Sequence, residues 1–356
     1  MQVSIPFMQL RGGSSKGIYF RADDLPQAES ERDQVLLSAV GRDARQIDGL
    51  GGANPLTSKV GIVSVSQRDD ADLDYLFVQV VVGEDRVDSS PNCGNILAGV
   101  GAFAIESGLL PAQGDITSLR IYMVNSDSLC EQIIQTPNGK VEYQGDVRID
   151  GVPGTAAPVI CNYLDVAGSA CGSLLPTGNQ RDVIDGIAVT CIDNGMPVVV
   201  INAAELGKTG YESCEELSAD EDFRARLEAI RLQAGHKMNL GDVTKKVVPK
   251  MTLIAPPRAG GHICTRTFIP HVCHAAIGVL GAVSVATACI LQDSVARGIA
   301  LVPEGSNKNM SVEHPSGEFS VELSLDDQGD VVKAGLLRTA RLLSKGELFI
   351  PEINHD

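Results

Sequence analysis

Two segments of the chain are apolar on nearly every side of a helix, and short strand-like runs precede and follow each of them. They are Asn95–Ser107, which reads NILAGVGAFAIES, and Ala275–Leu291. A helix without a polar face is buried, so each segment predicts a central helix covered by a sheet. A parallel α/β fold would need a helix between most of its strands. The pattern instead predicts an α+β fold with two pseudo-symmetric halves, each a curved, mostly antiparallel sheet around a central apolar helix.

The other predicted elements follow from hydrophobic periodicity and turn residues. Two amphipathic helices are expected at Ser30–Val40 and Ala219–Gln233. Runs rich in β-branched residues and bounded by Gly, Pro, Asn or Asp predict strands. These runs are Val60–Ser66, Tyr75–Val82, Leu119–Val124, Val141–Ile149, Val159–Tyr163, Pro197–Asn202, Lys250–Ala255 and Phe319–Leu325.

The length of 356 residues corresponds to two domains at roughly 150 residues each. The stretch 165–190 is rich in Gly, Ser and polar residues, as linkers between domains are. We therefore expect an N-terminal domain of residues 1–182 and a C-terminal domain of residues 183–356.

The charge balance excludes several classes of partner. The chain has 29 Lys+Arg against 45 Asp+Glu and a formal net charge of −16. Binding to nucleic acid or to anionic membranes requires a basic surface, so neither partner is expected. The N-terminal residues lack a basic segment followed by an apolar one, and no signal peptide is expected. The nine cysteines form no CxxC pair, which favours reduced thiols in a cytoplasmic protein.

Several motif-like segments lack the context that their chemistry requires. Gly99-Val100-Gly101 imitates a dinucleotide fingerprint but lies inside a predicted helix instead of a strand–helix turn. Gly207-Lys208-Thr209 imitates the end of a P-loop, but Asn202 occupies the position of that motif's first glycine. The histidines and cysteines of 262–274 lack zinc-ligand spacings, and no GxSxG serine elbow occurs. We therefore expect no bound metal.

Three polar segments of the first half carry groups suited to an anionic ligand. In residues 11–17 (RGGSSKG) paired glycines let backbone N–H groups approach a carboxylate or phosphate, and hydroxyls and cations add donors. Lys59 ends a second segment, 51–59, and could act as a general base where nearby cations favour its neutral form. Cys93 precedes the apolar helix, whose unpaired N–H groups favour a thiolate. The plainer interpretations are a hairpin with solvated charges, a solvated lysine and an inert thiol.

The second half contains two comparable segments. Arg266 and residues 270–274 (PHVCH) precede the second apolar helix, and residues 313–317 read EHPSG. A polar helix cap and an ordinary turn are the plainer interpretation of each segment taken singly. If pseudo-symmetry relates the halves, the two helix starts would face each other across a cleft, with one thiol on each side.

Taken together, these segments identify a family resemblance that runs from about residue 6 to residue 351. The chain resembles the PrpF family, whose relatives include methylitaconate isomerase, aconitate isomerase and the 4-oxalomesaconate tautomerases or Δ-isomerases. The sequences DYLFVQV and NCGNILAGVGAFAIE are most similar to those of the 4-oxalomesaconate enzymes. The motifs that carry the resemblance are RGGSSKG, GGANPLTSKV, DYLFVQV, NCGNILAGVGAFAIE, DGVPGTAAPV, LGKTGYE, RLQAGHKM and EHPSG.

The resemblance implies the diaminopimelate-epimerase fold, with an active site in the cleft between two similar domains. It implies no metal and no organic cofactor. The family's catalytic lysine in PLTSK and catalytic cysteine in CGN correspond here to Lys59 and Cys93. Cys273 is a positional analogue of the epimerases' second cysteine, but its flanking sequence departs from their motif, so no catalytic role is assigned to it.

The reaction implied is a 1,3 proton shift in an unsaturated oxo-tricarboxylate, through a dienolate, as in the breakdown of aromatic compounds. Such a shift needs a base, an acid and stabilisation of a developing oxyanion. Lys59 is expected as the base and Cys93 as the proton donor or relay. A small tricarboxylate is the expected partner, and a homodimer is the assembly considered. The expected substrate-binding residues are Arg11, Gly12, Gly13, Ser14, Ser15, Lys16, Ser58, Gly94, Asn95, Lys237, His271 and Ser316.

Three alternatives remain open at this point. The substrate could be methylitaconate or aconitate. The protein could be an amino-acid racemase or epimerase, because a fold does not fix a function. A noncatalytic carboxylate-binding protein would retain the RGGSSKG loop without needing Lys59 and Cys93 together.

Overall fold

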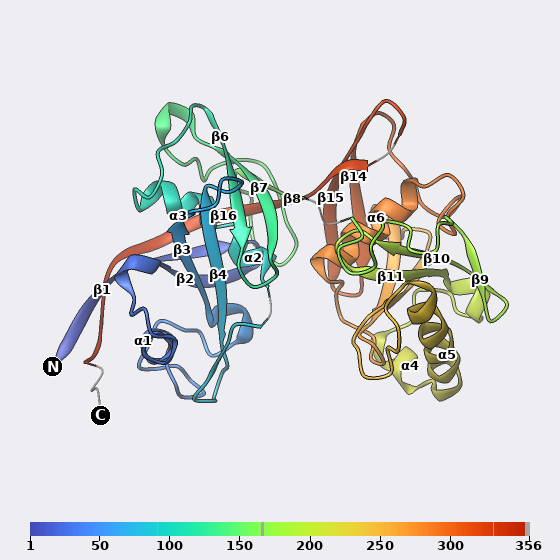
Figure 1. The fold of residues 1–356 in the computed structure, drawn as a ribbon, viewed down its shortest axis with the longest axis horizontal. Coiled ribbons are helices and arrows are strands. Elements are labelled where there is room, and N and C mark those ends of the chain that lie inside the picture. Colours follow the sequence, from blue (N-terminus) through green and yellow to red (C-terminus); the bar gives the residue numbers. More distant parts are fainter. Residues whose placement is uncertain (91, 165–166, 330, 353–356) are drawn as a thin grey trace. The chain divides into compact units, whose positions relative to one another are not determined.

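The computed structural model describes residues 1–90, 92–164, 167–329 and 331–352. Pro91 in the cysteine-bearing loop and residues 165–166 of the expected linker lie outside this part. The chain forms two compact units, Met1–Leu164 with Leu337–Asp356, and Asp165–Leu336 (Figure 1). The C-terminal stretch thus returns to the first unit, unlike the expected division at 182/183. The reason is that residues 340–351 of the last strand pair with the first strand.

The first unit is a closed ring of strands. Each strand pairs with the next in the order β1-β2-β3-β4-β6-β7-β8-β16, and β16 pairs back with β1. β5 pairs with β4 beside the ring, and helix α1 packs on the outside, against β4 and β5. The elements are β1 (Gln2–Gly12), β2 (Ser15–Arg21), α1 (Glu29–Val40), β3 (Lys59–Val65), β4 (Leu73–Val80), β5 (Val87–Asp88), α2 (Gly94–Leu97), α3 (Val100–Glu106), β6 (Ile116–Met123), β7 (Ser128–Gln135), β8 (Pro158–Leu164) and β16 (Val331–Pro351).

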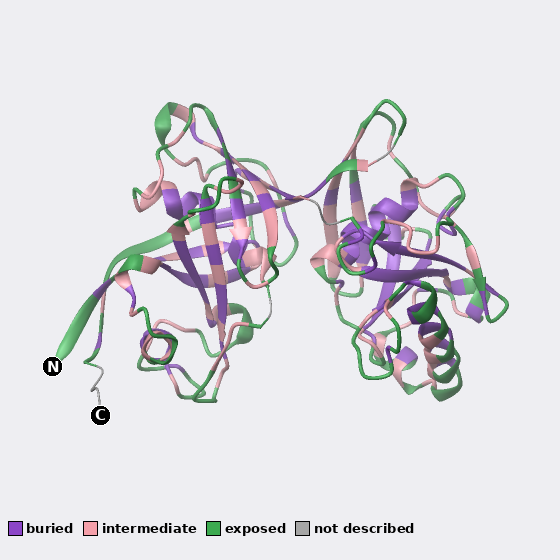
Figure 2. Ribbon diagram, in the orientation of Figure 1, coloured by how far each residue is buried: buried purple, intermediate pink, exposed green. Residues whose placement is uncertain are grey.

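Helices α2 and α3 fill the ring, as the apolar segment predicts (Figure 2). The segment is not one continuous helix, however, because it breaks between α2 and α3. The buried side chain of Gln132 fills the break, where its amide donates to Leu97 O at 2.8 Å and its Oε1 accepts from Gly101 N at 2.7 Å. The glycines allow close packing, since a Cβ atom on Gly99 would lie 2.4 Å from the Tyr19 hydroxyl.

The second unit is a curved sheet around one apolar helix. Its strands pair in the order β9-β10-β11-β12-β13-β14-β15-β16, and helix α6 contacts β10, β11, β14 and β15. α6 begins at Val279, four residues later than the predicted Ala275. The elements are β9 (Asp182–Ile184), β10 (Ile187–Asp193), β11 (Pro197–Asn202), α4 (Cys214–Ala219), α5 (Glu221–Lys237), β12 (Lys250–Ala255), β13 (Ile263–Phe268), α6 (Val279–Ile290), β14 (Asn307–His314) and β15 (Gly317–Leu325).

The two units follow the same succession of strand pairings. From β1 to β8 the successive pairs are antiparallel, parallel, antiparallel, parallel, antiparallel and antiparallel. From β10 to β16 the same six senses recur in the same order. In each unit the central helix follows the fourth strand of this succession. The predicted α+β class is confirmed, and two halves of similar topology are what an internally repeated fold would produce.

One predicted strand is wrong. Residues 141–149 alternate apolar and polar but form a loop with a single bridge, between Val147 and Ala156. The loop folds back on residues 156–157, just before β8, since a Cβ atom on Gly145 would lie 2.7 Å from Ala157 Cα. Its alternation therefore does not correspond to a paired strand. In the described part of the chain, no helix has both the length and the apolarity to cross a membrane.

Candidate active site

Lys59 begins β3 and faces Gln79 across the β3–β4 pair. Its half-buried ammonium donates to Gln79 Oε1 at 2.8 Å and lies 5.0 Å from the centroid of the Phe77 ring. The Gln79 amide nitrogen donates to Ser58 O at 2.8 Å and Val80 O at 3.1 Å. These bonds fix the amide so that its oxygen faces Lys59. Lys59 is thus held by a neutral acceptor and not by a carboxylate.

Cys93 immediately precedes α2 and is half-buried. Its carbonyl accepts from Leu97 N at 2.9 Å and from the Tyr75 hydroxyl at 3.2 Å, and its N–H donates to Asn92 Oδ1 at 2.8 Å. Burial first, and then the charge of a Cys93 thiolate, raise the pKa of Tyr75 well above its ordinary value. The phenol therefore stays protonated and holds the backbone that carries the thiol.

The Gly12–Ser15 hairpin packs directly on the start of α2. A Cβ atom on Gly12 would lie 2.2 Å from Asn95 O, and one on Gly13 would lie 2.1 Å from Asn95 Oδ1. Gly13 also has φ +51°, which favours glycine. The Asn95 amide donates to Ser14 Oγ at 3.2 Å and Ser15 Oγ at 3.4 Å. The hairpin glycines thus permit an approach that places two hydroxyls beside Asn95.

Strand β2 connects this hairpin to Lys59. Gly17 pairs with Lys59 in the parallel β2–β3 register. A Cβ atom on Gly17 would lie 2.8 Å from Ile96 Cδ1 and 2.9 Å from Lys59 O. The end of β1 and the beginnings of β2 and β3 therefore meet at the edge of the ring where α2 begins. The structure brings Lys59, Cys93, Asn95 and the hairpin serines to this one edge.

Arg11 and Lys16 do not share a face with Lys59. They lie opposite each other across the β1–β2 pair, in the row next to Leu10 and Gly17. Successive residues of a strand point to opposite faces, and Gly17 faces α2. Arg11 and Lys16 therefore point away from the helix, and their charges do not surround Lys59 as the sequence analysis expected.

Ser58 is fully buried, and its hydroxyl donates to Gln46 Oε1 at 2.7 Å and Asn54 O at 2.8 Å. These bonds turn the hydroxyl toward the loop before β3. The Ser58 carbonyl, which accepts from Gln79, therefore contributes to the site more directly than the Ser58 side chain does. Gly94, also predicted to bind substrate, is the first residue of α2.

The predicted residues of the second unit lie on separate elements of that unit. Lys237 is exposed in the last turn of α5. His271 Nδ1 lies 3.4 Å from Glu228 Oε2. Ser316 is exposed in the β14–β15 turn, with its Oγ 3.3 Å from His314 Nδ1.

Cys273 is buried, and Arg266 is held by backbone carbonyl groups. Burial first, and then the neighbouring Cys214, raise the pKa of the Cys273 thiol. The Arg266 guanidinium donates to Glu212 O at 2.7 Å and Thr265 O at 2.8 Å. In the described part of the chain, no three His, Cys, Asp or Glu side chains cluster in a way that could hold a metal ion.

Gln79 and Tyr75 are the residues of this site that the sequence analysis missed. Both lie in the segment LDYLFVQV, which predicts a strand and carries part of the family resemblance but gives neither residue a role. One signal was available, because a glutamine in an otherwise apolar strand beside a lysine-bearing strand needs a polar partner.

Comparisons with known proteins place the chain in a family. The family model described as PrpF protein matches residues 2–351. The chain is 59% identical over 350 residues to a 4-oxalomesaconate tautomerase of Pseudomonas putida, covering 98% of this chain and 97% of that protein. It is 57% identical over 348 residues to a (4E)-oxalomesaconate Delta-isomerase of Novosphingobium sp., covering 98% of each. A crystal structure of methylitaconate-delta-isomerase superposes with a TM-score of 0.88 at 33% identity, covering 98% of this chain and 96% of that one.

Proposed function

Because the chain belongs to the PrpF family, we propose that it is an isomerase that moves a proton within an unsaturated oxo-tricarboxylate, without a cofactor. The proposed substrate is 4-oxalomesaconate, and the product is 2-keto-4-carboxy-3-hexenedioate. The identities of 59% and 57% to enzymes named for oxalomesaconate support this substrate. The reaction would belong to the breakdown of aromatic compounds, in the cytoplasm. Methylitaconate and aconitate are the alternative substrates.

The observation that carries the proposal is that Lys59 and Cys93 belong to one edge of the first unit. Lys59 would remove a proton from the carbon beside a carboxylate, where conjugation to a C=C–C=O system spreads the negative charge into a dienolate. The Cys93 thiol would return a proton two carbons away or, in a tautomerisation, on the enol oxygen. Lys59 then carries the added proton and Cys93 is a thiolate, and a proton transfer between them through solvent restores both.

The partner of Lys59 supports its role as the base. A lysine must be in its neutral form before it can accept a proton as a general base. A carboxylate beside a lysine favours the charged form, whereas Gln79 is neutral and holds the amine by a single acceptor oxygen. Lys59 therefore keeps a fixed position, and among the described residues it forms no ion pair that would hold its proton.

The hairpin supports substrate binding. Ser14, Ser15 and Asn95 gather polar side chains next to Cys93, and hydroxyl and amide groups donate hydrogen bonds to carboxylates. Within the second unit, Lys237, His271 and Ser316 stay proposed contributors. A homodimer likewise stays a proposal.

Kinetics of two single variants test the function. We expect Lys59→Met and Cys93→Ser each to reduce kcat on 4-oxalomesaconate by about 10²-fold or more, measured from the absorbance of the conjugated product. Circular dichroism verifies that both variants fold. Wild-type rates in both variants would contradict the assignment. The wild-type enzyme is also compared on methylitaconate and aconitate, and a higher kcat/KM on either would replace the proposed substrate.

A further inference from the structure

Three cations stand in one row on the outer face of the first unit. Arg341 of β16 pairs with Arg11 of β1, and Arg11 pairs with Lys16 of β2. Like charges directly opposite one another in a sheet destabilise it. Within the described residues, no ion pair joins any of the three to an aspartate or glutamate. The row is therefore a local excess of positive charge on a chain of net charge −16.

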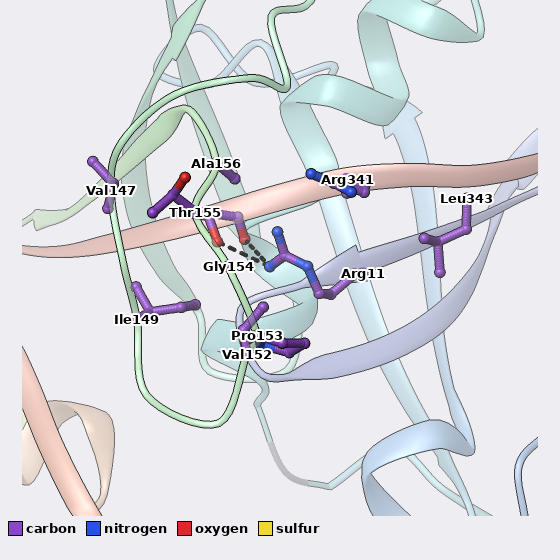
Figure 3. A pocket seen from close by; sticks show the side chains of 11 residues that line it. Arg11, Val147, Ile149, Val152, Pro153, Gly154, Thr155, Ala156, Arg341 and Leu343 are labelled. Atoms are coloured by element: carbon purple, nitrogen blue, oxygen red, sulfur yellow. Dashed lines mark hydrogen bonds between the residues drawn. The ribbon is translucent and has the colours of Figure 1, made fainter.

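A cavity of about 190 Å³ lies over Arg11 and Arg341 (Figure 3). It is formed by β1, β16 and the loop 147–156. Among the eleven described residues that line it, two are arginines and none carries a carboxylate. Val147, Ile149 and Leu343 give it an apolar wall. The cavity thus combines cations with a hydrocarbon surface.

The Arg11 guanidinium is held in place before any ligand arrives. One of its nitrogens donates to Gly13 O at 2.8 Å, Thr339 O at 3.1 Å and Thr339 Oγ1 at 2.9 Å. Figure 3 shows the group between β16 and the loop. Burial first, and then the charge of Arg341, lower the pKa of Arg11. Both effects disfavour the guanidinium charge, and an anion in the cavity would offset them.

We propose that this cavity binds a small organic carboxylate, with its carboxylate on the two guanidinium groups and its carbon chain on the apolar wall. A planar guanidinium suits a carboxylate because it can donate two parallel hydrogen bonds. The cavity is smaller than the roughly 300–1,000 Å³ of pockets for drug-sized ligands, so the ligand has only a few carbons.

The proposed carboxylate site is separate from the catalytic pair. Neither Lys59 nor Cys93 lines the cavity, and Arg11 lies on the opposite face of the sheet from Lys59. The hairpin contacts both regions, because Gly13 bonds to Thr339 on one side and packs against Asn95 on the other. A bound carboxylate would therefore stabilise the hairpin without occupying the position of the substrate.

Titration with butyrate tests the proposal, with butyramide as an uncharged compound of the same shape. We expect butyrate to raise the melting temperature of the wild type and of Lys59→Met equally, as a ligand of the folded state does, and butyramide to have no effect. By calorimetry, Arg341→Gln should weaken butyrate binding about tenfold or more, whereas Arg45→Gln, at an exposed arginine away from the cavity, should not. Leu343→Glu, which adds a carboxylate at the cavity, should abolish binding. It replaces Arg341→Gln as the test if that variant fails to fold.

Four results would overturn the proposal. The first is butyrate binding to Arg341→Gln or Leu343→Glu with wild-type affinity. The second is equal binding of butyramide, which would show that charge is not recognised. The third is loss of butyrate binding in Lys59→Met, which would place the ligand in the catalytic site. The fourth is the absence of any butyrate binding to the wild type at millimolar concentration.

Discussion

The cysteines that precede the two central helices differ sharply in their surroundings. Cys93 lies directly before α2, is half-buried and is adjacent to the hairpin contact at Asn95. Cys273 lies well before α6, is 5% exposed and pairs by an isolated bridge with Phe268. Burial and the neighbouring Cys214 raise the pKa of Cys273.

The difference shows that two units of the same topology need not carry the same chemistry. An epimerase that transfers protons on both faces of a carbon would use two available thiols. Burial disfavours a thiolate, so Cys273, the positional analogue in the second unit, is not comparable with Cys93. This favours the isomerase, with its lysine and cysteine in one unit, over the epimerase alternative.

The largest expected effect separates the two cysteines by activity. Cys93→Ser should reduce kcat by about 10²-fold or more, while Cys273→Ser should leave it within about twofold. The reason is that only Cys93 belongs to the edge that holds Lys59. Steady-state rates of the two variants, at matched folded fraction, make the comparison. A comparable loss in Cys273→Ser would revive the two-thiol mechanism.

A second prediction distinguishes the same thiols by their reactivity. The raised pKa of Cys273 keeps its thiol protonated at neutral pH, and only the thiolate is alkylated. Iodoacetamide should therefore label Cys93 more than about tenfold faster than Cys273 at pH 7.5, as read by peptide mass spectrometry. Prior incubation with substrate should slow the labelling of Cys93 alone. Equal labelling rates would show that the contrast in burial has no chemical consequence.

A smaller effect concerns the neutral partner of Lys59. Gln79→Leu removes the acceptor that positions the amine and should lower kcat/KM about tenfold. Gln79→Glu supplies an anion that favours the charged lysine. The increase of kcat/KM with pH should therefore occur at a higher pH in this variant than in the wild type. Profiles of kcat/KM against pH test both, with exposed Gln144→Leu as the control. Profiles that superimpose on the wild type would remove Gln79 from the account.

The smallest expected effect concerns the Gly12–Ser15 hairpin, which packs beside Cys93 and distinguishes the surroundings of this cysteine from those of Cys273. Gly13→Ala adds backbone strain and a clash with Asn95, and should cost about 2–4 kcal/mol of the free energy of unfolding. Gly108 also has positive φ, but a Cβ atom there meets nothing within 4 Å. Gly108→Ala should cost about 1 kcal/mol, and urea unfolding measures both. Equal costs would mean that the Asn95 contact is not tight.

The buried helices could be expected from the sequence, and the proposed catalytic pair came from the family resemblance. A helix without a polar face has one stable environment, and α1 and α5 lie close to their predicted ranges because amphipathic periodicity is local information. The resemblance located Lys59 and Cys93 by their motifs. The break between α2 and α3 could not be foreseen, because it depends on Gln132, a residue of a distant strand.

The faces of the strands could not be predicted either. A shift of one residue in register moves every side chain to the other side of a sheet. The segment RGGSSKG placed Arg11, Lys16 and the hairpin serines next to one another in sequence, but the β1–β2 register puts the cations on one face and the serines at the edge near α2. Sequence spacing alone therefore combined two regions that the fold separates.

Hydrogen exchange between substrate and solvent tests the central claim, that Lys59 removes the proton and Cys93 returns it. In D₂O, proton NMR follows the C–H signal of 4-oxalomesaconate alongside product formation. We predict that Cys93→Ser still exchanges this hydrogen for deuterium while product formation falls about 10²-fold or more, and that Lys59→Met loses both. Exchange at the wild-type rate in Lys59→Met would contradict the account.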